Sequence, residues 1–111
     1  MPWFITSICS KETMKRLSEK EKDHRFIPNR SRTFGFYNTY NEAYQAVKEN
    51  RCDMAECLYD YIIMECIEPG IHPMVHAKDW WQWDTNTNSW QYLCERDWPE
   101  EFIGLCNWAL G

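Results

Sequence analysis

The stretch WWQWDTNTNSWQYL, which begins at residue 80, contains four of the chain's seven tryptophans in a regular alternation. Residues 84–89 are polar and typical of a loop, and the residues on either side alternate as strands require, because strand side chains point to opposite faces in turn. If Trp83 pairs with Trp90, then Trp81 lies opposite Tyr92, and all four rings project from one face of a hairpin. Large aromatic side chains dominate the energetics of cores. The stretch therefore predicts a hairpin whose ring-bearing face is more often core than ligand-binding surface.

The opposite face of this hairpin is mixed in polarity, since it carries Trp80, Gln82, Gln91 and Leu93. A face that alternates between polar and apolar side chains is typical of one that contacts solvent. We therefore expect Trp80 to be the exposed ring of the hairpin and the one available to a ligand.

Three other segments have the composition of strands. Residues 3–9 and 32–38 are rich in β-branched and aromatic side chains, and Gly35 indicates a bulge or a close backbone approach in the second segment. Residues 59–68 form the strongest strand pattern, which is apolar on both faces and predicts a central strand covered on both sides.

Helical patterns lie between and after these strands. Thr39 and Glu42 fit the capping box of a helix start, and Asn50 suits the left-handed conformation that ends a helix. The tail from Asp97 onward predicts a second helix that packs on the sheet, and the charged residues 11–21 are compatible with a further short helix. The predicted fold is α+β: a two-layer domain with a mainly antiparallel sheet of about five strands, two helices, and a C-terminal tryptophan hairpin followed by a helix.

The chain has 111 residues, of which 44% are hydrophobic, and this is enough for one folded domain over residues 1–111. No apolar run approaches the ~20 residues that a membrane span needs. The start, MPWFITSICSKETMKR, has no cationic segment before its apolar run and is not expected to be a signal peptide. We therefore expect a cytoplasmic protein with reduced cysteines, which are Cys9, Cys52, Cys57, Cys66, Cys94 and Cys106.

Candidate metal and catalytic residues have unfavourable spacings. Cys52 and Cys57 are five residues apart, so a helix would turn their thiols away from each other, and Pro73 opposes a helix that would align His72 with His76. No phosphate-binding loop, dinucleotide glycine pattern or nucleophile elbow is present in the sequence. We expect no enzymatic activity, no metal and no cofactor.

Positive charge is concentrated in one part of an acidic chain. Residues 10–32 hold eight basic and four acidic residues, a local charge of +4 within a total of −5. General nucleic-acid binding needs many cations to neutralise phosphates and is not expected. The basic residues are typical of a solvated charged loop, and they are also able to attract one small anion or an acidic partner.

Three stretches of the chain resemble a family of small uncharacterised proteins from Gram-positive bacteria, their phages and other mobile elements. These are RTFGFYNTYNEAYQAVKENRCDMAEC, YDYIIMECIEPGIHP and WWQWDTNTNSWQYLCERDWPEEFIGLCNWALG. No catalytic residue comes with this resemblance. It implies a short cytoplasmic accessory protein, encoded by a phage, that acts by occupying a host molecule.

Two functions of different classes follow as hypotheses. In the first, the protein is an anti-defence sponge, a possible homo-oligomer, that sequesters a nucleotide-like immune signal. Arg25, Arg30 and Arg32 would hold its phosphates, and Phe34 or Trp80 would stack on its base. In the second, the protein is an interaction module that inhibits or adapts a host protein through its acidic remainder or an exposed aromatic patch.

Overall fold

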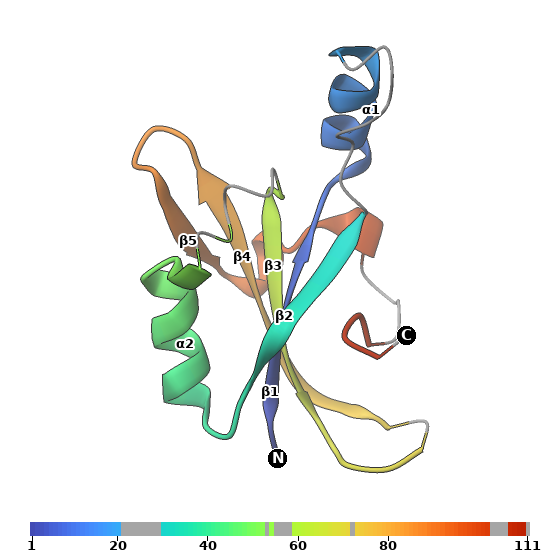
Figure 1. The fold of residues 1–111 in the computed structure, drawn as a ribbon, viewed down its shortest axis with the longest axis vertical. Coiled ribbons are helices and arrows are strands. Elements are labelled where there is room, and N and C mark those ends of the chain that lie inside the picture. Colours follow the sequence, from blue (N-terminus) through green and yellow to red (C-terminus); the bar gives the residue numbers. More distant parts are fainter. Residues whose placement is uncertain (21–29, 53, 55–58, 72, 103–106, 111) are drawn as a thin grey trace.

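The computed structural model describes residues 1–20, 30–52, 54, 59–71, 73–102 and 107–110. It is an α+β domain built on one antiparallel sheet of five strands in the order β2-β1-β3-β4-β5 (Figure 1). The strands are β1 (Trp3–Ile8), β2 (Ser31–Tyr37), β3 (Tyr61–Ile67), β4 (Val75–Asp84) and β5 (Ser89–Leu93). The predicted fold class and the predicted number of strands are confirmed.

Strand β3 is the central strand of the sheet, as its apolar pattern predicts. It pairs with β1 on one side and β4 on the other, and every residue from Ile62 to Ile67 is buried. Ile62 and Met64 face one hydrophobic cluster, whereas Ile63 faces a second cluster across the sheet. Both faces of the sheet are therefore covered.

Strand β2 forms an edge of the sheet and contains the predicted bulge. Its pairing with β1 shifts between Ile5, which faces Gly35, and Thr6, which faces Thr33, so Phe34 is the extra residue. Gly35 has a φ of +152°, a conformation that side-chain-bearing residues rarely adopt.

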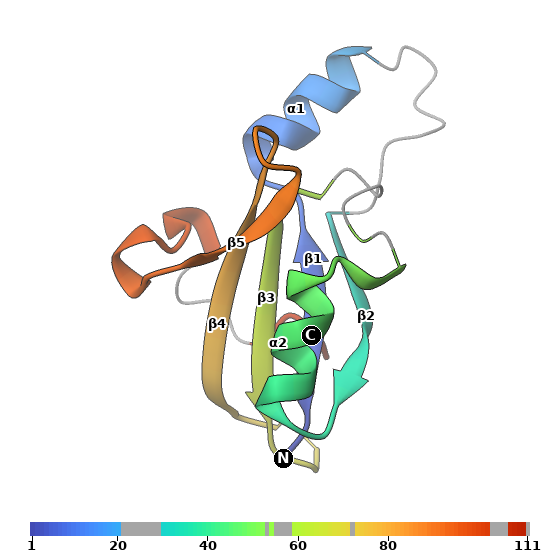
Figure 2. The ribbon, with the colours of Figure 1, turned by 90° about the vertical axis from the view of Figure 1, so that its left-hand side faces the viewer.

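Helix α2 (Tyr40–Lys48) covers the face of the sheet to which Ile62 and Met64 belong, called here the first face (Figure 2). The hydroxyl of Thr39 accepts a hydrogen bond from the Glu42 backbone N–H at 3.2 Å and donates one to the Glu42 carboxylate at 2.8 Å. After the helix, Asn50 has a φ of +52°, so both predicted ends are confirmed. Ala43 and Val47 are buried against the sheet.

The tryptophan hairpin has the predicted register, with Trp83 opposite Trp90 and Trp81 opposite Tyr92. The ring centroids of these two pairs are 5.2 and 5.5 Å apart, and both pairs are edge-to-face. Trp81 and Trp90 belong to the cluster beneath α2 and Trp83 is half-buried, but Tyr92 is 47% exposed. The ring-bearing face is therefore core at Trp81 and Trp90, partly buried at Trp83 and exposed at Tyr92.

The second face is covered by the C-terminal segment, which is not the predicted helix. The described residues form two 3₁₀ turns, η2 (Glu95–Asp97) and η3 (Glu100–Phe102). Trp98 lies between them with an extended backbone (φ −61°, ψ 141°), as expected for a residue before proline, so Pro99 breaks the segment rather than starting a helix. Phe102 is nevertheless buried on the sheet as predicted, and Cys106 lies outside the described residues.

A buried carboxylate holds the end of this segment. Glu65, on β3, is 1% exposed, and its oxygens accept hydrogen bonds from the backbone N–H groups of Trp108 at 3.0 Å and Ala109 at 3.1 Å. Burial raises the pKa of Glu65, and the two backbone donors oppose that shift.

Helix α1 (Lys11–Lys20) projects beyond one end of the sheet and covers neither face (Figures 1 and 2). It corresponds to the short charged helix compatible with the sequence. None of the described helices has both the length and the apolar character that a membrane span needs.

Candidate functional site

The predicted ligand-binding residues do not form one site. Arg32 and Phe34 lie together, with the Arg32 guanidinium carbon 4.9 Å from the Phe34 ring centroid, and Phe34 packs against the cluster beneath α2. Arg30 instead stacks on Phe102 at 5.2 Å, on the opposite side of the sheet. Arg25 lies outside the described residues.

The prediction that Trp80 is the exposed ring is wrong. Its side chain is 1% exposed and lies parallel to the ring of Phe102, with centroids 5.5 Å apart and an interplanar angle of 11°. Burial changes along this face of the hairpin. Gln82 is exposed near the loop, whereas Trp80 lies under the C-terminal segment.

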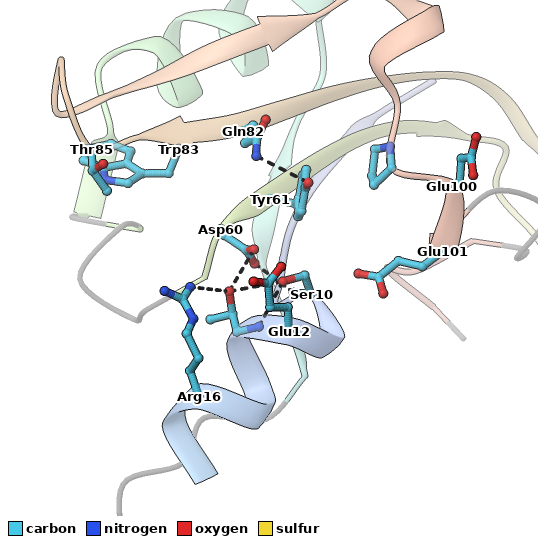
Figure 3. Close-up of a pocket in the computed structure, with 12 residues that line it drawn as sticks. Ser10, Glu12, Arg16, Asp60, Tyr61, Gln82, Trp83, Thr85, Glu100 and Glu101 are labelled. Atoms are coloured by element: carbon cyan, nitrogen blue, oxygen red, sulfur yellow. Dashed lines mark hydrogen bonds between the residues drawn. The ribbon is translucent and has the colours of Figure 1, made fainter. Parts of the chain in front are cut away.

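A cavity lies where α1, the start of β3, the hairpin and η3 meet (Figure 3). Its volume is about 520 Å³, within the range of small-ligand sites. Its lining comes from four separate parts of the chain and consists of Ser10, Glu12, Thr13, Arg16, Asp60, Tyr61, Gln82, Trp83, Thr85, Pro99, Glu100 and Glu101. We call it the acidic cavity.

Asp60 fixes one wall of the acidic cavity. Its carboxylate accepts a hydrogen bond from the Ser10 backbone N–H at 2.8 Å and one from the Thr13 hydroxyl at 3.1 Å. The Thr13 hydroxyl also accepts a bond from the Arg16 guanidinium at 3.2 Å. This network anchors the first turn of α1 to the start of β3, where Asp60 precedes Tyr61. The wall is therefore held by side-chain bonds and does not depend on packing alone.

Negative charge dominates the acidic cavity. Four carboxylates line it, from Glu12, Asp60, Glu100 and Glu101, against the single guanidinium of Arg16. The phenol of Tyr61 responds to this charge: burial raises its pKa, and the nearby carboxylates raise it further. Figure 3 shows the Glu101 side chain directed toward Ser10 and Glu12, and its carboxylate accepts a 3.3 Å hydrogen bond from the Lys11 backbone N–H.

Two aromatic side chains, Tyr61 and Trp83, complete the lining of the cavity. The Tyr61 hydroxyl accepts a 3.4 Å hydrogen bond from the Gln82 amide, and Trp83 packs edge-to-face on Trp90. Aromatic faces beside carboxylates attract cations, because the ring quadrupole and the negative charge act in the same direction. The arrangement suits a cationic group and repels an anion.

The candidate metal residues do not meet within the described part of the chain. Cys57 and His72 lie outside it, Cys52 is exposed, and His76 bonds to Glu68 at 3.0 Å. Among the described residues, no three histidine, cysteine or acidic side chains are grouped in a way that would hold a metal ion. Cys52, Cys66 and Cys94 form no disulfide.

None of the residues that line the acidic cavity is among the predicted ligand-binding residues. One local signal was available. Ser10 is a preferred helix N-cap before a charged segment, and Asp60 is a charged residue near the start of the apolar strand pattern of residues 59–68. Nothing in the sequence joins these two positions to η3.

No family model, no curated protein and no solved structure matches this chain. The candidate site is therefore interpreted from its own geometry.

Proposed function

We propose that this protein is a protein-interaction module whose acidic cavity accepts a basic side chain of a protein partner and so inhibits or adapts that partner. One observation carries the proposal: a cavity of about 520 Å³ combines four carboxylates with two aromatic side chains and only one cation. The predicted sponge residues, by contrast, are divided between the two faces of the sheet. The interaction module is therefore the better-supported of the two hypotheses.

Arginine suits this cavity better than lysine does. A guanidinium has a planar fork that pairs with a carboxylate through two hydrogen bonds and can stack on an aromatic face at the same time. Glu100 and Glu101 are exposed at η3, so an entering guanidinium can reach them. Tyr61 and Trp83 supply the faces.

The wider proposal is a non-enzymatic accessory protein that acts in the cytoplasm without a cofactor. The resemblance to small phage-borne proteins supports it, because such proteins act by occupying a host molecule. An acidic cavity that takes up a basic side chain is one physical means of doing so.

Calorimetric titration with a short arginine peptide tests the proposal, with a glutamate peptide of the same length for comparison. The double variant Glu100→Gln with Glu101→Gln should weaken arginine-peptide binding roughly tenfold, since exposed ion pairs contribute about 0.2–1 kcal/mol each. The matched control, Glu95→Gln with Asp97→Asn, removes two exposed carboxylates from the neighbouring turn η2. Both double variants have the same net charge, so a difference between them reflects the position of the carboxylates. The control should bind like the wild type, because Glu95 and Asp97 do not line the acidic cavity. Equal weakening in the two variants would mean that the peptide only senses the overall charge.

A further inference from the structure

A second cavity lies on the α2 side of the sheet, beside the edge strand β2. Its volume is about 280 Å³, and Phe34, Tyr37, Ala46, Arg51, Cys52 and Met54 contribute to its lining. Met54 and Ala46 are each 2% exposed and give the cavity a buried, apolar inner wall. We call it the β2 cavity. It lies on the opposite side of the sheet from Phe102, which belongs to the C-terminal segment.

Two guanidinium groups lie against aromatic rings of the β2 cavity. Arg32 stacks on Phe34 at 4.9 Å. Arg51 lies 5.8 Å from the Tyr37 ring centroid and donates a 3.1 Å hydrogen bond to the Tyr37 hydroxyl. Arg51 also donates to Glu49 at 3.0 Å, which fixes its guanidinium further. Arginines held in this way lose less conformational freedom when they bind an anion than mobile ones do.

The charge of the β2 cavity is opposite to that of the acidic cavity. Its described lining contains one cation, Arg51, and no carboxylate. Arg32 adds a second cation beside Phe34. The carboxylate of Glu49 offsets the charge of Arg51 in part. Apolar walls with arginines at the edge suit a ligand that is flat and apolar at one end and anionic at the other. Aromatic rings stack on nucleobases, and guanidinium groups bind phosphates through paired hydrogen bonds.

We propose that the β2 cavity binds a mononucleotide, with the base against Phe34 and Tyr37 and the phosphate between Arg32 and Arg51. The volume sets the size of the ligand, because 280 Å³ lies just below the range of about 300–1,000 Å³ for drug-sized ligands. A single base with one phosphate group matches such a space better than a dinucleotide does. This site is independent of the proposed interaction with a protein partner.

Calorimetric titration with AMP, GMP, CMP and UMP tests this inference in the full chain. At least one should bind with a Kd below about 1 mM. Arg32→Gln and Arg51→Gln should each weaken that binding about tenfold or more, the change expected when a hydrogen bond to a charged group is lost. Arg96→Gln is the matched control, because the Arg96 side chain is 85% exposed on η2. No binding by any of the four nucleotides, or equal affinity in Arg32→Gln and Arg96→Gln, would overturn the inference.

The location of the site has its own readout. Cys52 lines the β2 cavity and is exposed, whereas Cys94 is exposed elsewhere. The bound nucleotide should slow alkylation of Cys52 by iodoacetamide and leave that of Cys94 unchanged, as measured by peptide mass mapping. Unchanged alkylation of Cys52 at saturating nucleotide would place the ligand elsewhere. The Glu100 and Glu101 double variant should bind the nucleotide normally, which separates this inference from the proposed partner binding.

Discussion

Replacing Trp80 by alanine should destabilise the protein more than replacing Trp83, which lies in the same strand. Trp80 is 1% exposed and stacks on Phe102, and its edge-to-face contact with Tyr61 adds a second ring at 6.4 Å. Truncating a buried tryptophan costs about 3–5 kcal/mol, because the lost transfer free energy and the remaining cavity add together. With Phe102 and Tyr61 both losing a ring contact, we expect a value in the upper half of that range. That is a large share of the about 5–15 kcal/mol by which small domains are stable.

The matched comparison is Trp83→Ala, in the same strand. Trp83 is half-buried and faces the acidic cavity, so its truncation should cost about 1.5–3 kcal/mol, less than the full range for a buried ring. Guanidinium-induced unfolding, followed by far-ultraviolet circular dichroism, gives the free energy of unfolding of both variants and the wild type. If Trp83→Ala costs as much as Trp80→Ala, the C-terminal segment does not cover Trp80 in solution. The reasoning about the second face would then fail.

Three further predictions concern other parts of the molecule. Thr39→Ala removes the side-chain cap of α2 and should lower the free energy of unfolding by about 0.5–2 kcal/mol, measured by denaturant unfolding; an unchanged value would show that the cap contributes nothing. Burial raises the pKa of Glu65 above its usual 4.5, so the folded state holds this proton more tightly than the unfolded chain, and this group's contribution to stability should fall as the pH rises from about 4.5. The glutamine in Glu65→Gln cannot titrate, so the wild type should lose stability relative to this variant as the pH rises. A difference in unfolding free energy that is independent of pH would refute the raised pKa of Glu65. Burial raises the pKa of Cys9 to about 12, so iodoacetamide at about pH 8 should alkylate Cys52 in the native protein and spare Cys9 until denaturant is added; rapid native alkylation of Cys9 would contradict its burial.

Local patterns in this sequence predicted local structure well. The register of the hairpin follows from a period of two within one short segment, so pairing Trp83 with Trp90 determines every other pair. The start of α2 at Thr39 and its end near Asn50 follow from the backbone needs of those single positions. The central place of β3 follows from apolar side chains on both of its faces.

What the sequence did not predict depends on contacts between distant segments. Trp80 is buried because Phe102 stacks on it, and polar neighbours such as Gln82 give no indication of that cover. The acidic cavity likewise requires Asp60 and Glu101 to be brought to the same end of the sheet, and no local pattern links these positions. Arg30 and Arg32 would share one face of a regular strand, but Arg30 lies just before β2. Its guanidinium stacks on Phe102, whereas that of Arg32 stacks on Phe34, and the sequence does not indicate this separation.

The position of β1 inside the sheet, between β2 and β3, has a consequence for synthesis of the chain. This strand is synthesised before both of its neighbours, β2 and β3, and its residue Ile8 pairs with Tyr61 of β3. Until β3 emerges from the ribosome, one edge of β1 has no partner, and the apolar side chains of Ile5 and Ile8 have no second strand to pack beside. Closing so long a loop is slow compared with forming the β4–β5 hairpin. The nascent chain therefore carries an open, apolar strand edge until β3 has been synthesised, and in this form aggregation and chaperone capture compete with folding.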